Sequence, residues 1–275
     1  MLRRGVSIPA LKSYIYSQGA SRRVVNMVWN NFWSENKKEL DKSARRFMAI
    51  DSQQNATLKI TNFPSTTPAV EEETYVSTSL HPKDPSMGQR PMKLSSKVLL
   101  EKFDANECVE GESIVLLRWG VVKITSKTVD DHDKIQLEGE LVADGNYKSC
   151  KLKLSWIAIR NLSEDIDVVG NHFHDTDICP AVLTEFDHLV TKEKLEEGDK
   201  FEDYVNPTTL ATTNVIGDIN LKSLKEGDVI QLERRGFYRV DQPYRGSYEK
   251  PIILYMIPDG KMKSMSGRSG KLQHH

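Results

Sequence analysis

Arginine and lysine side chains gather in the first 50 residues, and these are the groups with which proteins bind phosphates. This stretch carries ten basic side chains and three acidic ones, although the whole chain has a net charge of −1. Clustered positive charge neutralises phosphates and steers a polyanion toward the protein surface. A solvated helix face explains the pattern equally well at this stage. The basic residues are Arg3, Arg4, Lys12, Arg22, Arg23, Lys37, Lys38, Lys42, Arg45 and Arg46.

A second group with possible chemistry is the imidazole, carboxylate and thiol set of residues 171–175 with Cys179. His172 and His174 would point to opposite faces of a strand, and their surroundings have the composition of a loop, so we expect no metal here. Cys179 and the other two cysteines, Cys108 and Cys150, form neither a CxxC pair nor a disulfide framework. We expect reduced, scattered thiols.

Signatures of catalysis are missing from the sequence, which has no Walker loop and no GxGxxG, GxSxG or HExxH motif. The acidic run 71–73 reads as a solvated surface. With 38% hydrophobic and 28% charged residues, the 275-residue chain has an ordinary globular composition and is long enough for two or three compact units. It has no apolar run of about 18 residues and no secretory h-region at its start, so we expect a cytoplasmic protein without a membrane partner.

Two helices are predicted to carry the basic residues. Residues 7–18 have a capping serine, a proline in the first turn, an apolar stripe and a terminating glycine. Residues 22–41 have a second apolar stripe. Within it, Trp29 and Trp33 stand one turn apart, and we interpret them as core residues rather than a platform for base stacking.

Short alternating runs follow a region rich in proline and threonine at 62–68 and predict small β-barrels. The turn residues at 144–146 predict a hairpin between the third and fourth runs. We find no internal repeat with a period of 20–50 residues. We expect 192–202 to be exposed and the tail beyond 260 to be disordered. The candidate strands are 113–119, 121–126, 134–142, 149–157, 182–189, 229–233, 237–241 and 252–256.

Six segments, taken in order along the chain, resemble the archaeal and eukaryotic branch of the glutamyl-tRNA synthetases and their glutaminyl relatives. Ser155 precedes Trp156 where the glutaminyl relatives usually have a histidine, and the run 231–237 resembles the glutamyl branch. The six segments are LRRG with LKSYI and SQGAS (2–21), SARRFMAI (43–50), HPK with GQR (81–90), LRWG (117–120), DVIQLERRGFY (228–238) and YMIPDGK (255–261).

The resemblance implies a mainly β fold with a helical N-terminal subdomain and two antiparallel β-barrels. Residues 1–50 are expected to form the helical subdomain. Residues 51–91 and 161–263 would form the proximal barrel, with the distal barrel, 92–160, inserted between them. Residues 264–275 are expected to be a disordered tail with a tag remnant.

The resemblance also implies anticodon-binding residues. Arg46 matches an arginine that reaches the second and third anticodon bases, Gln231 and Arg234 match a pair that brackets the middle base, and Arg118 is the candidate for the first base. Such side chains present donor forks and amides to the edges of unstacked bases. Gln231 and Arg234 alternate in facing along a strand, so a twist or bulge is needed to bring them together. Contacts to the tRNA backbone are expected from Arg3, Arg4, Arg22 and Arg23.

The parent implied by this resemblance is a glutamate–tRNA ligase that charges tRNA-Glu with the use of ATP and magnesium. Since the HIGH-type and KMSKS-type signatures are missing, the chain itself is expected to hold no cofactor and to be inactive in aminoacylation. Expected partners are tRNA-Glu and, as a further class, other synthetases or scaffold proteins, but not DNA. Three alternatives stay open: the glutaminyl counterpart, a protein-interaction module of a multi-synthetase complex, and a general RNA-binding barrel protein.

Overall fold

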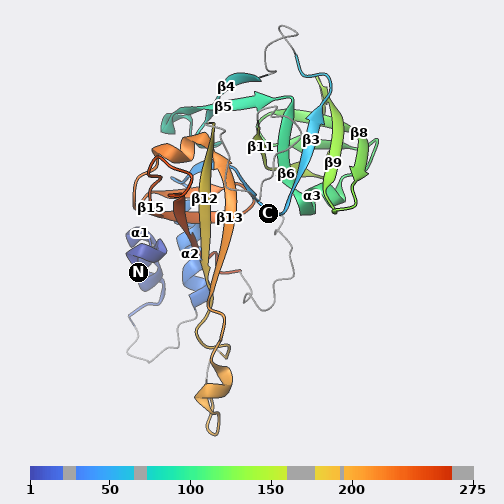
Figure 1. Cartoon of the computed structure of the whole chain (residues 1–275). Helices are drawn as coiled ribbons and strands as arrows, with labels where there is room; N and C mark the ends of the chain where they lie inside the picture. Colours follow the sequence, from blue (N-terminus) through green and yellow to red (C-terminus); the bar gives the residue numbers. More distant parts are fainter. Residues whose placement is uncertain (21–28, 65–72, 160–176, 193–194, 262–275) are drawn as a thin grey trace.

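The helical start of the chain is fixed by local signals and one buried amide. In the computed structural model, which describes residues 1–20, 29–64, 73–159, 177–192 and 195–261, a 3-10 turn η1 (Leu2–Arg4) precedes α1 (Ile8–Ser17) and α2 (Trp29–Leu40) (Figure 1). Ser7 caps α1 by accepting from Ala10 N at 3.5 Å, as predicted. The Asn36 side chain accepts from Ser7 N at 2.8 Å and donates to Gly5 O at 3.0 Å, which ties α2 to the start of α1.

The first sheet gathers strands from both ends of the chain. Its order is β1-β14-β15-β16-β12-β13-β2. Its core is filled by side chains such as Phe47, Ile230 and Leu254, each at most 1% exposed. The strands are β1 (Arg45–Phe47), β2 (Ala49–Asp51), β12 (Ile178–Phe186), β13 (Leu210–Asp218), β14 (Val229–Leu232), β15 (Gly236–Gln242) and β16 (Ile252–Ile257).

The second sheet is built mostly from the middle of the chain and has the order β10-β7-β8-β9-β3-β6-β11. Its core contains Trp156, which is 2% exposed and donates from Nε1 to Leu117 O at 3.0 Å. The short helix α3 (Lys102–Glu107) follows β6. The strands are β3 (Asn55–Ile60), β6 (Lys97–Glu101), β7 (Ser113–Leu116), β8 (Gly120–Val129), β9 (Ile135–Val142), β10 (Lys153–Leu154) and β11 (Trp156–Ala158).

Smaller elements lie outside these two sheets. β4 (Glu73–Ser79) and β5 (Gln89–Ser95) form a two-stranded hairpin that contains the 3-10 turn η2 (Pro85–Met87). The segment between β12 and β13 includes η3 (Phe201–Tyr204) and extends away from the sheets in Figure 1, while η4 (Ile219–Ser223) follows β13. No described helix is long and apolar enough to cross a membrane.

Each sheet is nearly closed into a barrel in the same manner. The outer strands of the first sheet, β1 and β2, are consecutive in sequence and are separated only by Met48. The outer strands of the second, β10 and β11, are separated only by Ser155. A single extended segment therefore crosses from one edge to the other in each barrel. Near-closure leaves little free strand edge, which is the usual benefit of a barrel.

The two barrels also share a sequence repeat. Gly111, Leu116, Arg118 and Gly120 are each followed, 116 positions later, by the same residue type: Gly227, Leu232, Arg234 and Gly236. Arg118 and Arg234 both have φ 66°, and the glycines at 111 and 227 have φ 83° and 90°. The backbone agrees, because Gly111 N donates to Ile124 O at 2.8 Å and Gly227 N to Val240 O at 2.9 Å. This period of 116 residues is longer than the 20–50 residues that are typical of repeat proteins.

The predicted architecture is confirmed: the fold is mainly β, with a helical start and two nearly closed, barrel-like sheets. Three of its details differ. β3 lies in the second sheet, so residues 55–60 do not belong with the proximal barrel, and β1 and β2 place 45–51 in that barrel rather than in the helical subdomain. The turn at 144–146 does not make a hairpin, because β9 pairs with β8 and β3 while β10 pairs with β7. Both sheets are mixed rather than antiparallel throughout, since β1·β14, β12·β16, β10·β7 and β3·β9 are parallel pairs.

Candidate nucleic-acid interface

Arg46 and Gln231 are direct neighbours across the parallel pair β1·β14. Ile230 and Leu232, on either side of Gln231, are fully buried in the barrel core. Because side chains alternate along a strand and align between paired strands, Gln231 and Arg46 share the outer face of the barrel. The structure thus brings together two residues that the sequence predicted to act on one base.

Both side chains retain unused hydrogen-bonding capacity. Arg46 donates from one terminal nitrogen to Asp41 Oδ1 at 2.8 Å, with the arginine side chain 15% exposed. Its Nε and Gln231 Oε1 are buried and have no hydrogen-bond partner among the described residues. Leaving such a buried group unpaired costs about 1–3 kcal/mol. We therefore expect a ligand or water to bind this donor and this acceptor.

Asp41 organises the surroundings of Arg46. Its carboxylate also lies 3.5 Å from Lys83 Nζ. Its carbonyl oxygen is 2.8 Å from Nε2 of His81, a side chain 2% exposed. Since Lys83 N donates to His81 Nδ1 at 3.3 Å, the imidazole is held as the Nε2–H tautomer. The HPK segment of the sequence thus supports Arg46 from the side opposite β14.

Arg118 lies in the left-handed turn between β7 and β8, and it reaches across to the other barrel. Its Nε and a terminal nitrogen bind Glu233 oxygens at 3.0 and 2.9 Å, and its other terminal nitrogen donates to Ser79 O at 2.8 Å. The side chains of Arg118 and Glu233 are each 12% exposed. This arginine connects two barrels, and its predicted contact with the first anticodon base stays a prediction.

Arg234 occupies the equivalent turn between β14 and β15 and also binds across the junction. It forms a two-pronged pair with Asp104 in α3, one bond at 2.7 Å, and Asp104 is fully buried. Arg235 next to it binds Glu101, whose pKa is raised by burial despite that partner. Because β14 ends at Leu232, the alternation expected at Arg234 does not apply, and a turn rather than a bulge sets its direction.

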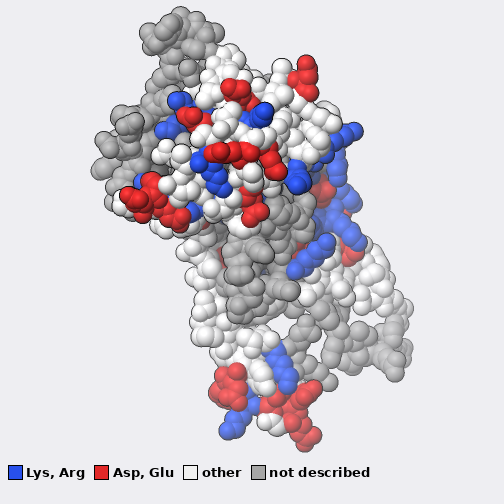
Figure 2. Space-filling model, turned by 90° about the vertical axis from the view of Figure 1, so that its right-hand side faces the viewer, with Lys and Arg blue, Asp and Glu red and all other residues white. Residues whose placement is uncertain are grey.

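The arginines expected at the tRNA backbone have different environments. Arg3 is exposed and binds Asp241 at 2.6 Å, which raises the pKa of Arg3. Arg4 lies over the Phe186 ring, 4.6 Å from its centroid, and burial lowers its pKa. Arg22 and Arg23 lie outside the described residues. Figure 2 shows a band of Lys and Arg side chains along one edge of the molecule, with a few acidic side chains among them.

Groups that could bind a metal do not cluster in the described residues. His172 and His174 fall outside them. Burial raises the pKa of the Cys108 thiol to about 11 and that of Cys179 to about 12. Thiols with such pKa values are protonated at neutral pH and poor as nucleophiles or ligands.

Comparison with known families identifies the fold. Residues 44–144 and residues 172–241 match two models with the same description: tRNA synthetases class I (E and Q), anti-codon binding domain. The chain belongs to this family. Each matched stretch of the chain contains one of the repeated turns, the first with Arg118 and the second with Arg234.

Curated relatives match nearly the whole chain. A probable cytoplasmic glutamate–tRNA ligase of Schizosaccharomyces pombe is 35% identical over 96% of the chain and 34% of its own length. The cytoplasmic glutamate–tRNA ligase of Saccharomyces cerevisiae is 36% identical with the same coverage. A bifunctional glutamate/proline–tRNA ligase of Cricetulus griseus is 35% identical over 98% of the chain and 17% of its own length. The chain therefore spans about a third of the first relatives and less of the bifunctional one.

Several residues of the interface carry no local signal in the sequence. Asp104, Glu101 and Glu233 were missed because their arginine partners are 115–134 positions away. The repeat aligns LLRWG with LERRG, so Glu233 takes the position of Leu117 in the equivalent turn. Trp29 was interpreted as core but is 53% exposed, so that interpretation was wrong.

Proposed function

We propose that this chain reads the anticodon of tRNA-Glu as part of a cytoplasmic glutamate–tRNA ligase. Support comes from the two anticodon-binding models and from relatives that are named as cytoplasmic glutamate–tRNA ligases. The glutaminyl counterpart is the alternative, because the family description covers both E and Q enzymes.

The observation that carries the proposal is the Arg46–Gln231 pair. A guanidinium N–H and an amide oxygen, buried, unpartnered and side by side on the outer face of a barrel, present one donor and one acceptor. The edge of an unstacked base offers the complementary acceptor and donor. In a partly dry site, each such bond discriminates strongly against a base that lacks the matching group.

Arg118 and Arg234 take a different part in this proposal. Each already satisfies a carboxylate across the junction, so direct reading by either would require it to leave a partly buried anion unpaired. We propose that these two arginines hold the two barrels at a fixed spacing. The successive bases of one loop would then also be held at a fixed spacing. Arg3 and the exposed basic band of Figure 2 are assigned to the tRNA backbone.

The chemistry of aminoacylation is assigned to the remainder of the parent enzyme. The motifs that hold ATP in this class are missing from the sequence. We therefore propose that the isolated chain binds tRNA but neither ATP nor magnesium, and does not aminoacylate. The bifunctional relative supports a parent that works beside other synthetases.

Binding of two tRNAs tests the proposal. The chain is titrated with tRNA-Glu and with the same tRNA carrying a changed middle anticodon base, at one salt concentration. We expect the cognate to bind more tightly by about 1–3 kcal/mol, and Arg46→Gln with Gln231→Ala to abolish the difference. Lys38→Gln, on the exposed face of α2, should preserve it. Equal binding of both tRNAs by the unmodified chain would refute anticodon reading by this chain.

A further inference from the structure

The two barrels are built to one plan. When the first sheet is taken from β1 to β2 and the second from β10 to β11, each neighbouring pair of strands in one has a counterpart of the same direction in the other. The order in both is parallel, antiparallel, antiparallel, parallel, antiparallel, antiparallel. Only the chain order differs, because β1 and β2 come first in their barrel while β10 and β11 come last in theirs. One barrel is therefore a circular permutation of the other.

This plan gives Arg46 a counterpart in the second barrel. The pair β1·β14 has the register Arg46↔Gln231, and the counterpart pair β10·β7 has the register Lys153↔Val115. Gln231 and Val115 are 116 positions apart, which is the spacing of the repeated turns. Lys153 therefore occupies in the second barrel the position that Arg46 occupies in the first.

The backbone hydrogen bonds lead to the same equivalence. In the first barrel, Glu233 N donates to Phe47 O at 2.9 Å. In the second, Leu117 N donates to Leu154 O at 3.0 Å. The two donors are again 116 positions apart, and each acceptor follows its barrel's cation by one residue. The equivalence thus depends on backbone geometry rather than on a likeness of side chains.

Lys153 lies on the outer face of its barrel. Ile114 and Leu116, on either side of Val115, belong to the core, and so does Leu154. Since side chains alternate along a strand and align between paired strands, Lys153 and Val115 point outward together. Lys153 is exposed, and its ammonium group has no partner among the described residues.

A second cation stands beside Lys153. Lys151 is exposed and likewise without a partner among the described residues, while Leu152 between them packs against the core. Val115 N donates to Leu152 O at 2.9 Å, so the chain is extended here and both lysines lie on the outer side. Two unpaired positive charges therefore stand about 7 Å apart.

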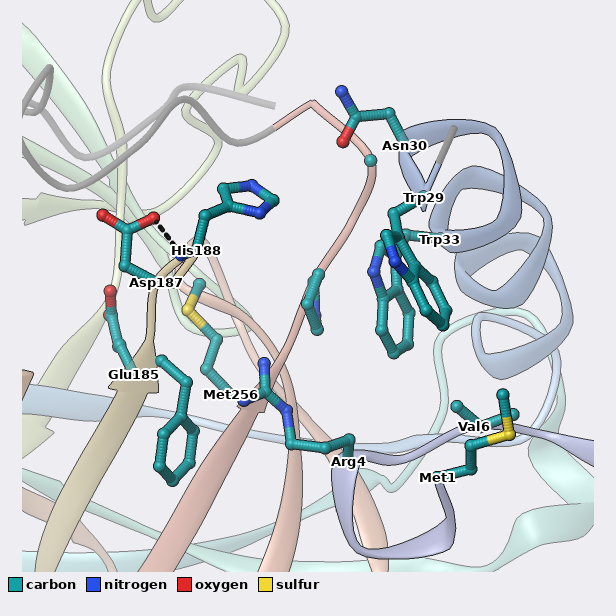
Figure 3. Close-up of a pocket in the computed structure, with 13 residues that line it drawn as sticks. Met1, Arg4, Val6, Trp29, Asn30, Trp33, Glu185, Asp187, His188 and Met256 are labelled. Carbon is teal, nitrogen blue, oxygen red and sulfur yellow. Dashed lines mark hydrogen bonds between the residues drawn. The ribbon is translucent and has the colours of Figure 1, made fainter. Parts of the chain in front are cut away.

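In each barrel the cation begins an outer row of side chains whose far members are covered. Beyond Gln231 the row continues to Phe237 and Ile257, which pack beneath the end of α2. The start of the same helix carries Trp29 and Trp33, which form the wall of a pocket of about 360 Å³ against the ends of β12 and β16 (Figure 3). The row in the first barrel is therefore open only at the Arg46 end.

The row of the second barrel is covered in a comparable way. Beyond Val115 it continues to Val121, which is 5% exposed. Gly145 packs on this valine so closely that a Cβ there would lie 2.4 Å from the valine Cβ. The open end of this row is again the end with the cation, Lys153.

The chemistry of the equivalent positions differs. Gln231 has an amide, whereas Val115 has no hydrogen-bonding group. Arg46 has a planar fork of donors, whereas Lys153 is a compact charge that suits a phosphate. The second barrel thus keeps the positive charge and lacks the groups that read a base edge. This combination is typical of a contact that positions an RNA without specifying its sequence.

The two positions are close enough for one RNA loop. Ser155 Oγ donates to Glu233 O at 3.1 Å. Ser155 follows Lys153 by two residues, and Glu233 follows Gln231 by two residues. Because two extended residues span at most about 7 Å, the backbones at Lys153 and Gln231 are roughly 20 Å apart or less.

We propose that Lys153, with Lys151 beside it, binds a backbone phosphate of the RNA loop whose base Arg46 and Gln231 read. This contact rests on the function proposed above, which supplies the loop. It adds affinity and fixes the position of the loop, while discrimination between bases belongs to the first barrel.

The salt dependence of binding tests the contact. The 275-residue chain is titrated with a stem–loop that carries the anticodon loop of tRNA-Glu, at several KCl concentrations. We expect Lys153→Gln to weaken binding about fivefold at 0.1 M salt and to lower the slope of log K against log[salt] by about 0.7. Lys153→Arg keeps the charge and should bind as the parent does. Lys59→Gln is the matched control, because Lys59 is 64% exposed on β3, which is not a neighbour of β7 or β10.

Single neutral linkages locate the phosphate. Stem–loops that each carry one methylphosphonate in the loop remove one charge at a time. One of them should bind the parent chain about as weakly as the unmodified loop binds Lys153→Gln, and it should lose nothing more in that variant. Inorganic phosphate at equal ionic strength should not compete, which distinguishes an RNA phosphate from a free phosphate ion.

The outcomes separate this contact from anticodon reading. If Lys153→Gln matched Lys59→Gln in affinity and salt slope, or if inorganic phosphate competed, the proposal would be overturned. Loss of discrimination between the cognate loop and one with a changed middle base in Lys153→Gln would make Lys153 a base reader and would also overturn it. Equal binding of those two loops by the parent chain, with a reduced slope in Lys153→Gln, would refute anticodon reading and support the phosphate contact.

Discussion

Arg118 and Glu233 join equivalent turns of two different barrels. The guanidinium binds the carboxylate at 3.0 Å through Nε and at 2.9 Å through a terminal nitrogen, although the two residues are 115 positions apart. Both side chains are largely shielded from water. The contact therefore helps to hold the two barrels together.

Glu233→Gln should destabilise the chain by roughly 3 kcal/mol, because it leaves the Arg118 cation shielded and without its counter-charge. Urea unfolding measures the change in the free energy of unfolding. Glu35→Gln breaks the exposed pair with Lys38 and should cost less than about 1 kcal/mol. Equal losses in the two variants would show that the Arg118–Glu233 pair is no more than a surface contact.

Asp104→Asn tests the assignment of Arg234. If Arg234 holds the junction, the variant loses stability of the same order as Glu233→Gln. Discrimination between anticodons should survive in the folded variant, because Arg46 and Gln231 are unchanged. Measured tRNA affinities decide the matter: a gain in discrimination after Arg234 is released from Asp104 would mark Arg234 as a base reader.

Gly260→Ala should be more destabilising than Gly246→Ala. Both glycines have a left-handed backbone, with φ 76° and 81°, so both substitutions carry a strain of about 1–2 kcal/mol. Only at Gly260 would the new methyl group meet Asn30 O and Ser34, which adds about 1–3 kcal/mol. Thermal unfolding of the pair measures the difference. Similar melting temperatures would mean that α2 can move away from the end of β16.

Cys150 should be the most reactive of the three thiols toward iodoacetamide at pH 8. Cys108 and Cys179 are buried with pKa values raised to about 11 and 12, so few thiolates form in the folded state. In the unfolded chain they ionise near pH 9, so stability is full below that pH and falls as the pH rises through 9 to 11. Mass spectrometry after labelling, with and without urea, measures the relative reactivity of the three thiols. Fast native labelling of Cys179 would contradict it.

Local signals made much of the fold predictable. Ser7 and Pro9 marked the start of α1, and apolar alternation marked β8, β9 and β15, because these signals depend only on near neighbours. The pairing of the strands was harder to predict from the sequence. The turn residues at 144–146 predicted a hairpin, but β8 and β3 occupy both edges of β9, and β10 pairs with β7 instead.

The candidate site was also predictable only in part. Arg46 and Gln231 were singled out by their resemblance to family positions, and the structure places them side by side. The carboxylates that bind Arg118 and Arg234 come from distant parts of the chain, and no local pattern in a single sequence indicates such pairs. The exposure of Trp29 was hidden because a helical stripe does not distinguish a core face from a pocket wall.

The repeated turns have a consequence for how two barrels can associate at all. Arg118 binds Glu233, yet its counterpart Arg234 binds Asp104 rather than residue 117, the counterpart of Glu233. The contact between the halves is therefore heterologous, with different patches on the two sides. If each barrel were a separate molecule, such a contact would leave one patch unused at every step and would build a ring or an open filament. Joining two such barrels in one polypeptide stops that assembly at its first step.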